Sequence, residues 1–107
     1  MTILRTAFFE ADLNDEQKED FYQYMENTVI PIIRTFPNNN GVVISKPEFI
    51  ESEDHQHLLL MLQHSYKDKP TMDKALNSDA RLDSMHATNK IIEKYNISVH
   101  HMNFMQD

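Results

Sequence analysis

The most constraining feature of this sequence is a run of five consecutive apolar residues, Leu58 to Leu62, inside the segment His57–Tyr66. The run is too short for a buried helix and is bounded by polar and proline-containing segments, so it predicts a central β-strand. Alternate residues of a strand point to opposite faces, and leucine or methionine stands in the middle of both faces here. Both faces must therefore be covered by other apolar surfaces.

Length and composition predict a single domain over residues 1–107, because 40% apolar and 25% charged residues are ordinary for a globular chain of this size. The net charge of −7 and the scattered basic residues argue against nucleic acid as a partner. No cysteine is present, which excludes disulfides and thiolate metal sites. No apolar run approaches the roughly 18 residues of a membrane span and no signal-peptide pattern is found, so we expect a cytoplasmic protein without a membrane partner.

The first part of the chain predicts a strand followed by a helix. Thr2–Phe9 alternates aromatic and β-branched residues, which favours a strand. Asn14 can cap a helix while Gln17 reaches back to it, and an apolar stripe at helical spacing then runs to Phe36. Pro31 lies late in this helix and removes one backbone hydrogen bond, so we expect a kink there.

The second part predicts two strands, a helix in two pieces and a last strand. Val42–Lys46, continued by Phe49–Ile50 beyond Pro47, is expected at a sheet edge because proline cannot donate to a ladder. The strand His57–Tyr66 follows. A helical segment then breaks and is capped again at Asn77–Asp79. Ile97–Met105 alternates as the final strand.

The resulting order is strand, helix, strand, strand, helix, strand. Right-handed crossovers place the strands as 4-1-3-2, the ferredoxin-like α+β arrangement with both helices on one sheet face. We expect the uncovered face to carry Ile3, Ala7, Phe9, Leu58, Leu60, Leu62, Met102 and Phe104. Such an apolar surface is too large to leave in water, and pairing two sheets about a two-fold axis removes it, so the sequence predicts a homodimer.

This layout over nearly the whole chain, with the Asp15-Glu16-Gln17-Lys18 helix opening and the Leu76-Asn77-Ser78-Asp79 break, resembles the dimeric α/β-barrel superfamily. That superfamily includes antibiotic-biosynthesis monooxygenases, stress-responsive barrel proteins and haem-degrading monooxygenases. The resemblance implies a pocket in each subunit between the helices and the barrel sheet, closed by the partner. It also implies that no metal or cofactor is needed, as in many members.

Two branches of the superfamily match the residues poorly. Polyketide-cyclase-like members have a histidine on the second helix, where Arg81 stands nearest here, and the aspartate expected on the last strand is not evident. Haem-degrading members have an asparagine on the first strand, a tryptophan at the end of the third and a histidine on the second helix. Tyr66 takes the tryptophan place, His86 lies one residue off the histidine register, and the first strand has no asparagine. Haem binding is kept as a minor alternative.

The candidate chemical groups are Arg5, His64, Tyr66 and His100. His64 and Tyr66 share one face of the strand, and Arg5 is expected on the same side of the sheet. A cation, an imidazole and a phenol beside apolar walls can bind an aromatic or enolate-like substrate and move a proton. The alternative is that they are partly solvated strand-end residues paired with acids. His100 and His101 point to opposite faces, and the pattern leaves open which of them faces the interior.

The expected pocket walls are Leu60, Leu62, Arg81, His86 and Met102. His55 and His57 have a spacing that can bind a metal with a carboxylate, but an ordinary solvated turn is the preferred interpretation, and no metal site is predicted. The sequence therefore favours a homodimeric pocket protein for a small apolar or aromatic molecule. It is expected to act as a cofactor-independent monooxygenase-like enzyme on an aromatic or polyketide-like substrate. The competing hypothesis is a non-catalytic dimer that binds a ligand or a partner protein.

Overall fold

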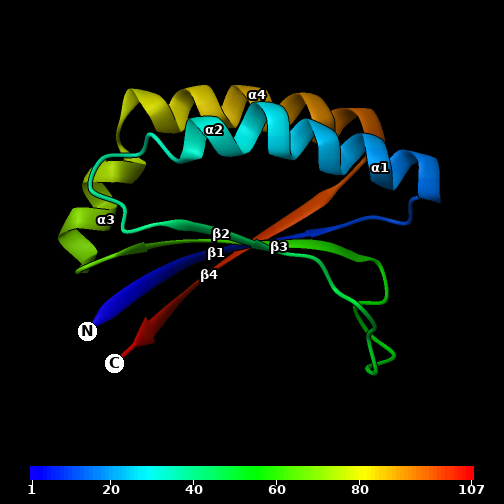
Figure 1. The fold of residues 1–107 in the computed structure, drawn as a ribbon, viewed down its shortest axis with the longest axis horizontal. Helices are drawn as coiled ribbons and strands as arrows, with labels where there is room; N and C mark the ends of the chain where they lie inside the picture. The colour runs from blue at the N-terminus through cyan, green and yellow to red at the C-terminus, as the bar shows by residue number, and fades with distance from the viewer.

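The computed structural model describes residues 1–107 as one antiparallel sheet with its helices on one face (Figure 1). Its elements are β1 (Thr2–Glu10), α1 (Asp15–Tyr24), the π-helical turn η1 (Met25–Val29), α2 (Ile30–Ile33), β2 (Val42–Ser45), β3 (Leu58–Tyr66), α3 (Lys69–Leu76), α4 (Asp79–Tyr95) and β4 (Ser98–Gln106). The strand order is β2-β3-β1-β4, which confirms the predicted ferredoxin-like topology with an inner strand over the Leu58–Leu62 run. None of the helices has the length and apolar character that crossing a lipid bilayer requires.

The caps predicted from the sequence form at the starts of both main helices. The Asn14 side chain accepts a hydrogen bond from the backbone N–H of Gln17 at 2.9 Å, and the Gln17 side chain accepts one from the Asn14 N–H at 3.0 Å. This reciprocal pair satisfies two backbone donors that the helix itself cannot. Ser78 caps α4 by accepting from the N–H of Arg81 at 3.3 Å, so the break in the second helix is confirmed.

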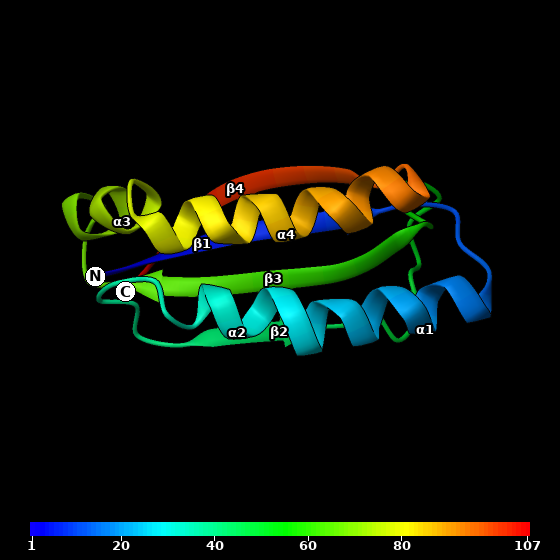
Figure 2. The ribbon, with the colours of Figure 1, turned by 90° about the horizontal axis from the view of Figure 1, so that it is seen from above.

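Where the sequence predicted a kink at Pro31, the structure has a widened turn, η1, just before the proline. The Ile30 N–H donates to the carbonyl of Met25, five residues back, so the hydrogen-bond ladder has already shifted when it reaches the proline. A π turn of this kind adds one residue to the helix without breaking it. Accordingly α1 and α2 run on as one continuous helix beside α4 (Figure 2).

The edge position of β2 is confirmed, but the predicted continuation through Phe49–Ile50 is wrong. The strand ends at Ser45, just before Lys46 and Pro47, because proline has no N–H to offer β3. Residues 46–57 instead form a loop that projects from the sheet on the side away from the helices (Figure 1). Phe49 in this loop is 73% exposed.

The predicted assignment of sheet faces is wrong, because the helices cover the opposite face from the one expected. Ile3, Ala7, Phe9, Leu60 and Leu62 are buried in the core beneath the helices. Cross-strand pairing groups them: Ala7 stands opposite Leu62, and Phe9 stands opposite Leu60. Because both faces of β3 are apolar, the alternation of side chains along the strand shows which residues share a face. It does not show which of the two faces the helices cover.

The face left uncovered by the helices, called the open face below, is still markedly apolar. It carries Leu4, Phe8, Leu58, Met61, Met102 and Phe104, of which Met102 is 52% and Phe104 42% exposed. Leu58 reaches this face through an irregularity in the β1–β3 pairing, which places it opposite Glu10 and leaves Leu59 in the core. The argument for a second covering layer therefore stands with a different set of side chains.

Two tyrosines of α1 hold the helical layer in place. The Tyr22 hydroxyl donates to the carbonyl of Leu59 on β3 at 2.8 Å, and the Tyr24 hydroxyl donates to the carbonyl of Ala87 on α4 at 2.7 Å. Phe21 directly precedes Tyr22 in sequence and is fully buried against Phe9. These contacts fix the spacing between the sheet and α4, where the candidate site lies.

Candidate functional site

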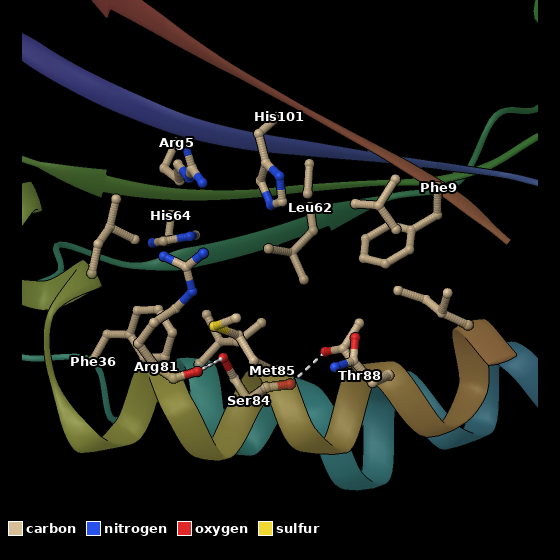
Figure 3. A pocket seen from close by; sticks show the side chains of 16 residues that line it. Arg5, Phe9, Phe36, Leu62, His64, Arg81, Ser84, Met85, Thr88 and His101 are labelled. Carbon is tan, nitrogen blue, oxygen red and sulfur yellow. Dashed lines mark hydrogen bonds between the residues drawn. The ribbon is translucent and has the colours of Figure 1, made fainter.

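A cavity of about 200 Å³ lies between α4, the end of α2 and the covered face of the sheet. Figure 3 shows its two unlike ends: Arg5, His64 and Arg81 gather near Phe36, whereas Phe9 lies at the far end. The basic and imidazole groups come from different elements, namely Arg5 from β1, His64 from β3, Arg81 from α4 and His101 from β4. The cavity therefore joins a polar end to an apolar one.

The strand register explains why three of these side chains point into the same space. Arg5 stands opposite His64 in the β1–β3 pairing, and Ala7 stands opposite His101 in the β1–β4 pairing. Arg5 and Ala7 are two residues apart on β1, so their side chains and those of their partners lie on one face. Arg81 reaches this group from the first turn of α4 (Figure 3).

His64 is a buried imidazole in contact with a buried phenol. Its Nδ1 lies 2.7 Å from the Tyr66 hydroxyl, and its ring meets Phe36 edge-on at 5.4 Å between centroids. Burial, and then the nearby charges of Arg5 and Arg81, lower the pKa of His64 to about 4. Burial raises the pKa of Tyr66 to about 12. Both groups are therefore uncharged at neutral pH.

This pair can hold or move one proton. A neutral imidazole has one N–H donor and one acceptor nitrogen, and a tyrosine hydroxyl both donates and accepts, so Tyr66 can match either tautomer of His64. The Nε2 of His64 has no protein partner. Since no unpaired side-chain nitrogen or oxygen of the fold is sealed from solvent, Nε2 keeps some access to solvent, and His64 lines the cavity. A ligand in the cavity can contact an uncharged base, His64, whose other ring nitrogen is hydrogen-bonded to the Tyr66 phenol.

Arg5 supplies a partly buried cation next to this base. Its Nη1 donates to the Oδ1 of Asn103 at 3.4 Å, which leaves most of its N–H groups unused by the protein. Burial, and then the positive charge of Arg81, lower the pKa of Arg5, while Tyr66 acts in the opposite direction. Arginine keeps its charge even so, because its ordinary pKa is so high.

Of the two adjacent histidines, His101 faces the cavity and His100 does not. The pKa of His101 falls to about 4, through partial loss of water around the ring and the charges of Arg5 and Arg81, although the residue as a whole remains exposed on the edge strand. His100 lies on the open face, with its Nε2 3.2 Å from Glu10 Oε2. The expectation that His100 belongs to the site is corrected, because the β1–β4 register gives that place to the next residue.

The other predicted pocket residues divide between the cavity and other places. Leu62 and Arg81 line the cavity. The assignments of the other three to the pocket are corrected. Leu60 is on the covered face but outside the cavity, Met102 is on the open face of the sheet, and His86 is an exposed residue of α4.

Sequence reasoning missed the part of α4 that faces the sheet. Ser84 and Thr88 follow Arg81 at helical spacing and line the cavity with it (Figure 3). Their hydroxyls donate to helix carbonyls, Ser84 to Arg81 at 2.8 Å and Thr88 to Ser84 at 2.6 Å. The i, i+3, i+7 spacing of Arg81, Ser84 and Thr88 indicates that they share one face of the helix. Small polar residues at these positions are not typical of a buried face, so the spacing alone did not identify them.

No group of three or more histidine and acidic side chains is arranged to hold a metal ion. His55 contacts Glu10 at 2.9 Å, whereas His57 lies 3.7 Å from Asp12, so the two histidines turn to different carboxylates. His86, the residue nearest to the histidine of the haem-degrading branch, lies outside the cavity. The histidine position that the haem-degrading branch uses on its second helix is therefore not represented in this cavity.

The buried state of His64 predicts a loss of stability in mild acid. The folded protein keeps this ring neutral until about pH 4, whereas the unfolded chain takes up the proton near the ordinary value of 6.5. Between these pH values the unfolded state binds more protons, so stability falls as the pH falls, by about 1.4 kcal/mol per pH unit. Urea unfolding is expected to show a loss of about 2 kcal/mol from this residue between pH 6.5 and pH 5.

The variant His64→Gln is expected to lose this part of the pH dependence, while the exposed His86→Gln keeps the full dependence. A His64→Gln protein that loses stability as steeply as the parent protein over the same range contradicts the burial of an uncharged ring at this place.

Comparison with known proteins identifies the fold. No protein-family model and no curated protein matches the sequence. Among solved structures, a protein of the ethyl tert-butyl ether degradation (EthD) family from Bacillus halodurans superposes with a TM-score of 0.79 at 19% identity, over 100% of both chains. A dimeric ferredoxin-like protein of unknown function from Bacteroides fragilis gives 0.68 at 8% identity, over 98% of this chain and 96% of the other.

A third similar structure is SnoaB, a cofactor-independent oxygenase from Streptomyces nogalater. It superposes with a TM-score of 0.54 at 10% identity, over 98% of this chain and 91% of that one. The structural neighbours are thus ferredoxin-like proteins that include dimers and oxygenases, in agreement with the resemblance found in the sequence. At these identities the likeness concerns the fold alone.

Proposed function

We propose that this protein is a homodimeric, cofactor-independent monooxygenase-like enzyme that acts on a small aromatic or polyketide-like substrate. The observation that carries the proposal is the position of His64, which lines a cavity whose other end is apolar. An uncharged imidazole beside a guanidinium is suited to removing a proton and holding the anion that results. The resemblance to a cofactor-independent oxygenase supports this choice of reaction class.

The proposed reaction uses the substrate itself as the source of electrons. His64 takes a proton from an acidic carbon next to a carbonyl, and Arg5 stabilises the enolate that forms. The enolate then reduces dioxygen. The overall change converts a CH2 group to a carbonyl: one oxygen atom enters the product, and the other leaves as water with the two hydrogens of the CH2 group. Tyr66, through Nδ1, would keep the imidazole in position during the proton transfer.

The homodimer is part of the proposal because the open face needs a cover. Its side chains Phe8, Met102 and Phe104 are apolar, and none of the helices of residues 1–107 lies over them. The loop 46–57 projects beyond this face, where it would flank a second copy (Figure 1). Structural neighbours described as dimeric support the same occupant. A two-fold pair of sheets places identical apolar surfaces against each other.

Oxygen consumption tests the enzyme proposal. With 2-tetralone or phenylacetone, whose CH2 groups are acidified by a carbonyl, the protein is expected to accelerate oxygen uptake above the rate without protein and to yield the diketone. Tetralin is the matched control, because it lacks the carbonyl and cannot form an enolate. Absence of acceleration with either ketone, under conditions in which the ketone binds, contradicts an oxygenase.

A non-catalytic ligand-binding dimer is the second candidate. The lining of the cavity favours it, because most of the lining residues are hydrophobic and offer no chemical group. The hydroxyls of Ser84 and Thr88 are also occupied by helix carbonyls and add little to a reaction. Binding of a ketone without oxygen uptake selects this candidate.

A further inference from the structure

Two guanidinium groups face the same cavity without a counter-charge. Arg5 comes from the sheet and Arg81 from α4, and both lie at the end of the cavity that holds His64 (Figure 3). Neither takes part in an ion pair, although the chain has 17 acidic and 10 basic residues and forms ion pairs elsewhere. No aspartate or glutamate lines the cavity. An acidic protein has thus gathered uncompensated positive charge in one enclosed place.

This arrangement opposes folding in the absence of a ligand. Two like charges that are partly removed from water repel each other and lose hydration, and no acidic side chain of the cavity offsets either effect, although Arg5 has a 3.4 Å hydrogen bond to Asn103. An anion bound between them removes both penalties at once. A carboxylate suits this position because a planar guanidinium can donate two parallel hydrogen bonds to its two oxygens.

The apolar part of the cavity determines the size and polarity of the rest of the ligand. Phe9, Leu62 and Val99 form apolar walls away from the arginines. The volume of about 200 Å³ lies below the usual range for ligand sites and suits a body of one small ring or a short branched chain. An anion with no apolar part would leave these walls in contact with water.

We propose that Arg5 and Arg81 form a clamp for the carboxylate of a small aromatic or apolar carboxylic acid, whose body lies against Phe9, Leu62 and Val99. This inference rests on the proposed function in one respect, that the cavity binds a small molecule. It adds that the ligand carries a permanent negative charge before any proton transfer to His64.

Phenylacetate and phenylacetamide provide the test, because they have nearly the same shape and differ in charge. Binding is measured by titration calorimetry at pH 7.5 and low salt, and its place by NMR shifts of the Leu62 and Val99 methyl groups. Phenylacetate is expected to bind at least about tenfold more tightly than phenylacetamide, and its affinity should fall as salt is added. Acetate, which has no apolar body, should bind at least about tenfold more weakly than phenylacetate.

Arginine variants assign the preference to the clamp. Arg5→Gln and Arg81→Gln should each reduce the acid-over-amide ratio, and the double variant should bring it to about one. Arg34→Gln is the matched control, because Arg34 is the one other arginine of the chain and lies exposed at the end of α2. Arg81→Lys should retain part of the acid-over-amide preference, since lysine keeps the positive charge but cannot donate two parallel hydrogen bonds to a carboxylate. Without ligand, Arg81→Gln should melt at a higher temperature than the parent protein.

The possible results separate this inference from the proposed function. If both compounds shift the methyl groups of Leu62 and Val99 with equal affinity, the clamp is overturned and the small-molecule pocket stands. If phenylacetate binds more tightly but Arg34→Gln lowers the ratio as much as Arg81→Gln does, the clamp is likewise overturned. If neither compound affects these methyl groups in the parent protein, both the clamp and the pocket fall.

Discussion

A Phe104→Glu substitution is expected to convert a dimer of this protein into monomers at micromolar concentration. Phe104 lies on the open face opposite Leu4 of β1 and is 42% exposed in the single chain. In a two-fold pair of sheets each substitution occurs twice, so two carboxylates would enter one apolar contact without partners. The free energy of association should fall by about 3 kcal/mol or more, which raises Kd by more than about a hundredfold.

Sedimentation velocity measures this change. Leu82→Glu is the matched control, because Leu82 is a similarly exposed apolar residue, at 54%, but belongs to α4 in the helical layer on the other side of the sheet. The control should sediment as the parent protein does. A parent protein that is already monomeric at micromolar concentration contradicts the proposed dimer, and a dimer that Phe104→Glu leaves intact contradicts its placement on the open face.

The second large effect is expected at His64. Once a turnover is established, His64→Gln should lower kcat by about 10² to 10⁴, the usual contribution of a positioned general base. Glutamine can still bond the Tyr66 hydroxyl, so the change removes the base while keeping the local contact. Tyr66→Phe should have a smaller effect, because it removes the group that orients the imidazole and not the imidazole itself.

The readout that separates chemistry from folding is the pH profile. Burial lowers the pKa of His64 to about 4, so the parent protein should gain activity as the pH rises through this value, and His64→Gln should lose this rise. Urea unfolding at pH 7.5 shows whether each variant is folded. His86→Gln, an exposed histidine on α4, should match the parent in both measurements. Equal turnover in the parent and His64→Gln removes His64 from the reaction.

The topology was readable from the sequence because it depends on local patterns. The caps at Asn14 and Ser78 are short-range hydrogen bonds, and the structure forms both. The lengths of the periodic segments then gave the order of strands and helices, and the right-handed crossover rule left one arrangement of the sheet. Each of these rules requires only residues close together in the chain.

The candidate site was readable only in part, because it joins four elements across the fold. Alternation along the two strands predicted that Arg5 and His64 share a face. The strand register confirms this, because the two residues stand opposite each other. The places of His100 and His101 were not decided by alternation, since that depends on which residue of β1 each strand residue pairs with. The cluster that includes Arg81 required the position of α4 over the sheet.

The sequence by itself determined that one strand is apolar on both faces, and therefore that the sheet needs two covers. Only the tertiary structure decided which face the helices take, and so which residues, such as Leu62, lie in the cavity and which, such as Phe104, are left for a second copy. The physical reason is that a pleated strand has two equivalent sides in its own sequence pattern. The choice between them is made by packing against distant helices, where the side chains of α4 and the sheet must fill one space.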